Sequence, residues 1–208
     1  MSVVTNAVDL LGMASLLITF IFLSASYMHS LIDWLSIQSA AIALAFTLMG
    51  WETNSYSLYA LAGITFIFRA LVVPYILKKD IRDDERIWRY REIKTTHHAI
   101  VWGLIVAVVA YFLYQPIYEV TGVWSGSIAF VMLLLSFLAI VTRRNALAQI
   151  VGYVSMENSL LYLAAILSPM SLILEIGILL DILGFALLAV VLGARKRYGP
   201  LEVEELVG

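Results

Sequence analysis

Four charged side chains lie inside long apolar runs of the sequence and away from the ends of those runs. They are Arg69, Glu157, Glu175 and Asp181. Charged groups are costly inside a lipid bilayer, and there they usually mark an ion path, a proton relay or an ion pair between helices. A carboxyl group that takes up and releases a proton at mid-membrane is what a proton relay requires. We therefore predict that these four residues form a proton or ion relay.

A polar stripe leads to one of these acids. Gln149, Tyr153 and Glu157 recur every four residues, and residues at this spacing share one face of a helix. The stripe predicts an access path from the inner surface to Glu157. Gln38, in an earlier apolar run, is a candidate for the same path or for a hydrogen bond between helices.

Helical geometry gives the depth of the acids. At about 1.5 Å per residue, Glu157 lies ~18 Å and Asp181 ~20 Å from the inner side, so both are near mid-membrane. Glu175 lies nearer the outer side. Asp181 comes six positions after Glu175, so the two acids point in different directions, one toward the sixth span and the other toward a neighbouring subunit.

A structural interpretation of the same residues stays open. The two deep acids can form an ion pair or a neutral hydrogen bond that only holds helices together. Arg69 can simply neutralise a partner carboxylate. The sequence alone does not choose between relay and scaffold.

The elements that carry these residues are membrane spans. The chain of 208 residues is 62% hydrophobic and 13% charged, whereas soluble domains carry about 25% charged residues. A helix needs about 20 mostly apolar residues to cross a bilayer. Seven such runs predict an all-α, polytopic membrane protein. They are Val8–Met28, Leu31–Gly50, Tyr56–Leu77, Ala99–Ile117, Val123–Val141, Ala146–Leu167 and Ser171–Ala194.

The basic residues predict the orientation. Of the 13 Lys and Arg residues, seven lie between Lys78 and Lys94, two are Arg143 and Arg144, and three are residues 195–197. With seven spans, all three groups fall on one side, which the positive-inside rule makes the inner side. We therefore expect the N-terminus outside, the C-terminus inside, and a basic inner loop at Arg143 and Arg144.

Several classes of site are excluded or not indicated. The sequence has no cysteine, which excludes disulfides and Cys-ligated clusters in this chain. It has no HExxH, GxSxG or Walker-type motif, and its three His do not suggest a metal site. A net charge of -2 does not favour nucleic acid. We expect no catalytic centre, metal or cofactor of its own, and lipid as its solvent.

The polar motifs of the last three spans resemble a known family. They are Thr142-Arg143-Arg144-Asn145, Ser155-Met156-Glu157-Asn158, Leu174-Glu175 and Asp181-Ile182-Leu183-Gly184-Phe185-Ala186-Leu187. They resemble the component E family of hydrogenase-4 and formate hydrogenlyase complexes. They are also similar to the K subunit of respiratory complex I and the C subunit of Mrp-type cation/proton antiporters. Residues 68–74, with Arg69 ahead of Pro74, are similar to the same component E family.

The resemblance implies an organisation and a function. Residues 1–115 would form an N-terminal four-helix membrane region with an inner-side loop at 78–97, and residues 116–208 a K-subunit-like three-helix region. The chain would be a membrane-arm subunit of an energy-converting hydrogenase in the cytoplasmic membrane of a prokaryote, taking part in proton or sodium translocation coupled to electron transfer.

The same resemblance implies the partners. They would be antiporter-like and H-subunit-like membrane proteins together with peripheral nickel–iron hydrogenase and iron–sulfur subunits. Two other functions stay open. One is a subunit of an Mrp-type antiporter without a redox partner, and the other is a purely structural membrane scaffold.

Overall fold

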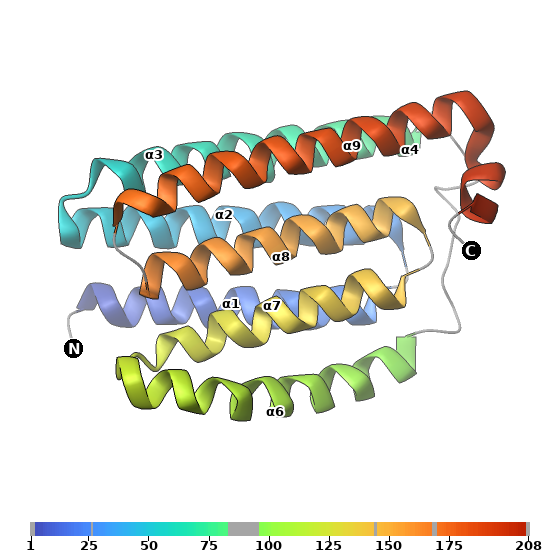
Figure 1. Ribbon diagram of the computed structural model, residues 1–208. Coiled ribbons are helices and arrows are strands. Elements are labelled where there is room, and N and C mark those ends of the chain that lie inside the picture. The colour runs from blue at the N-terminus through green and yellow to red at the C-terminus, as the bar shows by residue number, and fades with distance from the viewer. Residues whose placement is uncertain (1–2, 26, 83–95, 144, 168–169, 207–208) are drawn as a thin grey trace.

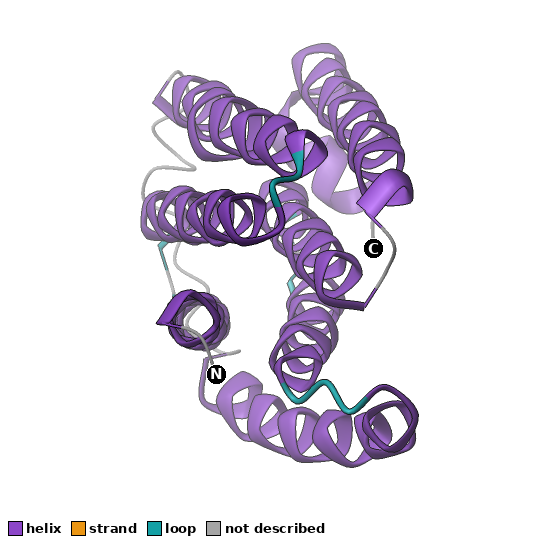
Figure 2. Cartoon of the chain, turned by 90° about the vertical axis from the view of Figure 1, so that its left-hand side faces the viewer, coloured by secondary structure: helices purple, strands orange, loops and turns teal. Residues whose placement is uncertain are grey.

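The computed structural model describes residues 3–25, 27–82, 96–143, 145–167 and 170–206, and the regular structure of this part of the chain is helical. Its helices are α1 (Val3–Ser24), α2 (Met28–Thr53), α3 (Tyr56–Ile64), the π-helix η1 (Thr65–Val72), α4 (Val73–Arg82), α6 (Thr96–Thr121), α7 (Ser125–Thr142), α8 (Ala146–Leu167) and α9 (Met170–Leu206). Figure 2 looks at the bundle from one end and shows the helices lying alongside one another.

In the described part of the chain, seven helical segments are long and apolar enough to cross a membrane, with α3, η1 and α4 together forming one of them. The prediction of an all-α, seven-span membrane protein is confirmed. The helices extend past some predicted limits. The last one continues beyond Ala194 to Leu206, and α4 and α6 reach into the predicted loop 78–97. Residues 83–95 of that loop lie outside the described part.

Local chemistry explains where several helices begin and end. Asn54 follows α2 in the left-handed region, with φ 50°, a conformation that Asn tolerates at a helix C-terminus. Gly122 has φ 67° directly after α6. At the start of α8, the side-chain oxygen of Asn145 accepts a hydrogen bond from the Leu147 amide at 2.8 Å, as an N-cap does.

The spans form two layers of three (Figure 1). One layer holds α1, α2 and the α3–η1–α4 span, and the other holds α7, α8 and α9. Across the layers α1 packs against α7, α2 against α8, and α3 against α9. The remaining helix, α6, packs along α7 and α1 at one edge of the bundle. The division predicted at residue 115/116 falls near the end of α6, and the helices before and after it share one bundle.

Buried polar residues form a layer between two apolar cores. We call the end of the bundle with Lys78 and Arg143 the basic end. The apolar cluster toward that end includes Leu35 and Val154, and the second cluster includes Ile42 and Leu161. The residues that come between these positions along α2 and α8 include Gln38, Ser39, Ser155, Glu157 and Asn158, all buried. The fold therefore places hydrogen-bonding groups in the middle of the spans.

Candidate functional site

The π-helix η1 positions Arg69. Pro74 has no N–H, so it cannot donate to the Ala70 carbonyl four residues earlier, as the residue at that place in an α-helix would. The Ser36 hydroxyl on α2 donates to this carbonyl instead. Membrane helices commonly repair such a break with Ser or Thr side chains and local π geometry. The sequence Arg69 to Pro74 thus produces a widened turn, and π segments often occur at functional sites.

Arg69 joins three side chains from two other helices. Its Nε donates to Oδ1 of Asp181 on α9 at 2.7 Å, and its Nη1 donates to Oδ1 of Asn158 on α8 at 3.2 Å. Its Nη2 lies 3.3 Å from Oε2 of Glu157, an ion pair without hydrogen-bond alignment. We call Arg69, Glu157, Asn158 and Asp181 the Arg69 cluster.

The Arg69 cluster is deep in the membrane span, where Asn158 is fully buried and the Asp181 side chain is 12% exposed. Arg69 is 1% exposed and Glu157 2%. Glu157 is eleven residues from the start of α8 and ten from its end, about 15 Å from either end at 1.5 Å per residue. The depth predicted for Glu157 and Asp181 therefore agrees with the geometry of the bundle. The structure brings Arg69, Glu157 and Asp181 together, as a relay or an ion pair requires.

Gly184 allows α9 to approach Glu157 closely. A Cβ at position 184 would lie 3.2 Å from Oε1 and 3.3 Å from Oε2 of Glu157, and 3.5 Å from Cε1 of Tyr153. Any side chain there would press on the carboxylate. Gly184 thus lets α9 pack against Glu157 while Asp181, three residues earlier on α9, contacts Arg69.

A small cavity lies beside the Arg69 cluster. The volume that the centre of a water molecule can occupy is about 10 Å³, and the lining residues include Arg69, Glu157 and Asp181. Oε1 of Glu157 and Oδ2 of Asp181 are buried and accept no hydrogen bond from the described residues. Phe68 and Phe185 also line the cavity and meet edge to face, with ring centroids 5.3 Å apart. This aromatic pair bridges η1 and α9 next to the charges.

The net charge of the Arg69 cluster depends on one proton. With both carboxyl groups ionised, one guanidinium leaves a net charge of −1. One added proton makes the cluster neutral. Because an uncompensated charge in a buried site is strongly unfavourable, this arrangement is suited to holding one exchangeable proton.

The polar layer continues from the Arg69 cluster to α2. The amide nitrogen of Asn158 donates to the Ser39 hydroxyl at 2.8 Å. Next to Ser39, Gln38 donates through Nε2 to the Thr19 hydroxyl on α1 at 2.9 Å. The predicted candidate Gln38 is therefore buried in this layer, where it links α2 to α1.

The other predicted access residues lie toward the basic end. Tyr153 is one turn from Glu157, and its buried hydroxyl interacts with the Glu157 carboxyl group. The Gln149 side chain donates to the carbonyl oxygen of Arg143 at 2.8 Å, so it also fastens the connection between α7 and α8.

Arg143 is buried against the end of α1. Its Nη2 donates to the carbonyl oxygens of Phe22 at 2.5 Å, Ala25 at 2.8 Å and Leu23 at 3.4 Å. A guanidinium at this place satisfies carbonyls that the end of a helix leaves unpaired. Arg144, the second basic residue predicted for the inner loop, lies outside the described residues.

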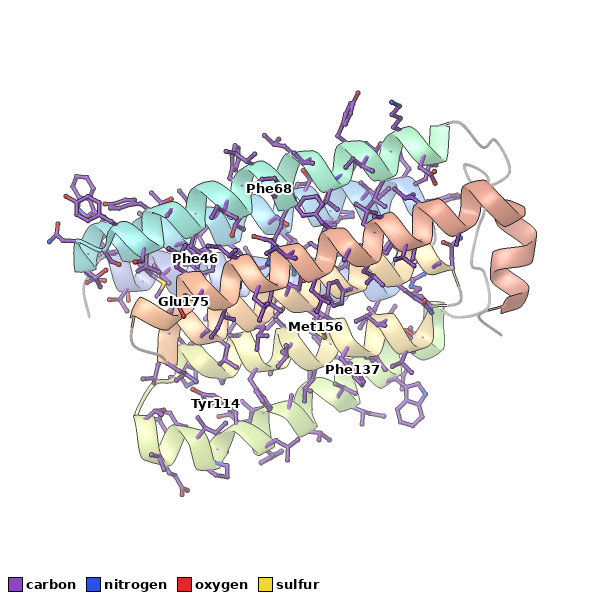
Figure 3. The ribbon with its side chains drawn as sticks, turned by 45° about the horizontal axis from the view of Figure 1, so that its top comes forward. Phe46, Phe68, Tyr114, Phe137, Met156 and Glu175 are labelled. Carbon is purple, nitrogen blue, oxygen red and sulfur yellow. The ribbon has the colours of Figure 1, made fainter. Side chains whose placement is uncertain are left out.

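Glu175 is not part of the Arg69 cluster. Its side chain is exposed near the start of α9 (Figure 3), whereas Asp181 faces Arg69. The two acids therefore point in different directions, as their six-residue spacing predicts.

Sequence reasoning did not assign three polar residues of the interior. Asn158 and Ser39 complete the hydrogen bonding around Arg69, and the position of Asn158 beside Glu157 was the available signal. Asp9 on α1 is 8% exposed, and its Oδ1 accepts a hydrogen bond from the Ser125 hydroxyl at 2.6 Å. An acid in the first apolar run was the signal for that pair.

The chain is similar to known proteins over nearly its whole length. It is 32% identical to hydrogenase-4 component E of Escherichia coli, over 98% of this chain and 95% of that protein. Hydrogenase-4 component E of Shigella flexneri shows the same values. An uncharacterized protein of Mycobacterium tuberculosis is 25% identical over 86% of this chain and 84% of its own length. No family model and no solved structure matches the chain. With one third of its residues identical to component E along almost the whole sequence, this seven-span protein belongs to the hydrogenase-4 component E family.

Proposed function

We propose that this chain is a membrane-arm subunit of an energy-converting hydrogenase complex in the cytoplasmic membrane of a prokaryote. In that complex it takes part in moving protons or sodium ions, coupled to electron transfer. The proposal is supported by its relatives named hydrogenase-4 component E. The observation that carries it is the contact of Arg69 with two acids from different helices at mid-membrane.

The Arg69 cluster acts as a loading site in this proposal. Arg69 is the ion-pair partner of both Glu157 and Asp181, and in this proposal the carboxyl group that gives up its contact with Arg69 is the one that takes up the proton. Tyr153 and Gln149 line the access from the basic end. A relay needs groups that exchange a proton without a large change in energy, and a shared guanidinium provides such a balance.

The redox chemistry belongs to partner subunits in this proposal. The chain has no cysteine, so iron–sulfur clusters bound by thiolates have to sit on other chains. Peripheral nickel–iron hydrogenase and iron–sulfur subunits would supply electron transfer. Antiporter-like and H-subunit-like membrane subunits would extend the ion path.

A scaffold role is the second candidate, and one observation favours it. Arg69 ties η1 to α8 and α9, and removing one partner of a buried ion pair destabilises a protein strongly, by about 3–5 kcal/mol. In that case the acids would matter for assembly and not for transport.

Two conservative variants separate these functions. Glu157→Gln and Asp181→Asn each keep the shape of the side chain and remove the exchangeable proton. The complex with each variant is purified, reconstituted into vesicles and driven by formate or reduced ferredoxin, and the ion gradient formed per electron is measured. Glu119→Gln, an exposed acid at the end of α6, is the matched control.

The proposal predicts that both variants assemble and transfer electrons but build at most one tenth of the wild-type ion gradient, while the control matches wild type. Normal gradients in both variants would show that the relay is wrong. Failure of assembly in both variants, with an intact control, would support the scaffold.

A further inference from the structure

We propose that the Arg69 cluster exchanges protons and excludes sodium, and that Arg69 is the residue that sets this selectivity. This inference rests on the proposed function and decides which ion the site takes. It depends on three features of the site: the volume of its cavity, its charge, and the oxygen atoms that accept no hydrogen bond.

The space beside the Arg69 cluster suits one water molecule. Its cavity offers about 10 Å³ to the centre of a water, close to the smallest volume that holds a single water. A hard metal cation takes about six oxygen ligands. Among the residues that line this cavity, side-chain oxygens come only from Glu157 and Asp181, and one oxygen of each accepts no hydrogen bond from the described residues. One water and these two carboxyl groups do not complete the shell of a sodium ion.

The charge of the site also opposes a metal cation. Arg69 already occupies the place between the two acids, at 2.7 Å from Asp181 and 3.3 Å from Glu157. A sodium ion bound to the same carboxylates would lie beside the guanidinium, and repulsion between like charges is strong where water is scarce. Sodium could enter only if Arg69 left, and Arg69 is 1% exposed and also bound to Asn158.

A proton meets neither obstacle. It forms an O–H bond with one carboxylate oxygen and needs no shell of ligands. Glu157 Oε1 and Asp181 Oδ2 are free oxygens of the two residues, and both residues line the cavity. A water there would accept the proton of Glu157 while giving one of its own to Asp181. The water is regenerated, one O–H bond forms on Asp181 as one breaks on Glu157, and the total charge is unchanged.

The charged and titratable groups around this exchange come from three elements. Among the described residues they are Arg69 from η1, Tyr153 and Glu157 from α8, and Asp181 from α9. The neighbour from α2 is Ser39, a hydroxyl bound to Asn158. The site therefore offers a sodium ion only the two carboxylates that Arg69 already pairs.

The test compares two ions in one assay. The complete complex in vesicles is driven by electron transfer in buffer with sodium or with choline in its place. Internal pH and uptake of radioactive sodium are recorded together. We expect the same pH change in both buffers, within twofold, and no sodium uptake above that of vesicles poisoned with a hydrogenase inhibitor.

Sodium uptake that Glu157→Gln abolishes, or a pH change that requires sodium, would overturn this inference and leave the proposed function intact. If electron transfer proceeds and neither ion moves, the proposed function itself is wrong.

A second measurement does not depend on turnover. Infrared difference spectra of the complex are recorded as pH or sodium is changed, and the spectrum of Glu157→Gln is subtracted. The proposal predicts that pH changes the carboxyl bands of Glu157 and that sodium at constant pH and ionic strength does not. A sodium-induced band that the variant lacks would contradict it. If the variant does not assemble, isotope-edited spectra of the wild-type complex make the same comparison.

Discussion

Ser36 on α2 donates its hydroxyl hydrogen to the Ala70 carbonyl oxygen on η1, the acceptor that Pro74 cannot serve. This contact joins the two helices one residue away from Arg69. It therefore holds the widened turn that directs the guanidinium toward Glu157 and Asp181.

Removing this hydroxyl should loosen the turn. Ser36→Ala leaves a partly buried carbonyl without its donor, a change that costs about 1–3 kcal/mol. We expect a lower thermal stability of the complex and weaker ion transport. Ser24→Ala is the control, because among the described residues that hydroxyl bonds to the Ile21 carbonyl of its own helix and to no other helix. Equal melting temperatures for the two variants would show that the Ser36 contact is not structural.

Gly184 provides a test with a control on the same helix. Gly184→Ala places a methyl group 3.2 Å from Glu157 Oε1, so α9 or the carboxylate has to move, at a cost of about 1–3 kcal/mol. Gly193→Ala meets no atom within 4 Å and favours a helix slightly. We predict at least a fivefold loss of ion transport for Gly184→Ala and none for Gly193→Ala. Similar transport in both would contradict the close contact of α9 with Glu157.

Arg69 is expected to be essential because it is the positively charged partner of two acids. Arg69→Met removes the positive charge and leaves two buried carboxyl groups, which should destabilise the fold by about 3–5 kcal/mol. Adding Glu157→Gln and Asp181→Asn removes those charges and should restore much of the assembled protein. The amount of complex in membranes measures both effects. If the triple variant assembles no better than Arg69→Met, the ion pairs do not explain the role of Arg69.

Arg143 should stabilise the fold without touching the Arg69 cluster. Arg143→Ala leaves three carbonyls at the end of α1 without this donor, and bonds to a charged group contribute about 1.5–3 kcal/mol. We expect a lower melting temperature with an unchanged ratio of ions moved to electrons transferred. Lys79→Ala, an exposed basic residue near the same end, should change neither. A selective loss of transport in Arg143→Ala would place Arg143 in the ion path.

The sequence predicted the fold and the main charged residues because both depend on local properties. Apolar length and the cost of a membrane charge identify the spans and single out Arg69, Glu157 and Asp181. Which side chains of different helices form contacts is not a local property, because it depends on the orientation of each helix about its own axis. The position of Asn158 beside Glu157 indicates only that it lies near the site. Its bond to Arg69, and the bond by which the Ser36 hydroxyl replaces the one missing at Pro74, depend on how the helices pack. The buried cap formed by Arg143 likewise requires knowledge that the end of α1 lies beside it.

The orientation of Glu175 also depends on how the helices pack. Its spacing from Asp181 predicts different directions for the two acids, but only packing reveals which acid faces Arg69. Asp181 faces Arg69, and Glu175 is exposed. A role for Glu175 in the relay stays a prediction that concerns the surface of α9.

The most direct test of the central claim is a cryo-electron microscopy structure of the assembled hydrogenase complex at a resolution that shows side chains and waters. We predict that the Arg69 guanidinium lies within about 3 Å of carboxyl oxygens from both Glu157 and Asp181, with one water beside them. An Arg69 turned toward the basic end, or either carboxyl group against lipid tails with no polar atom or water in reach, would contradict it.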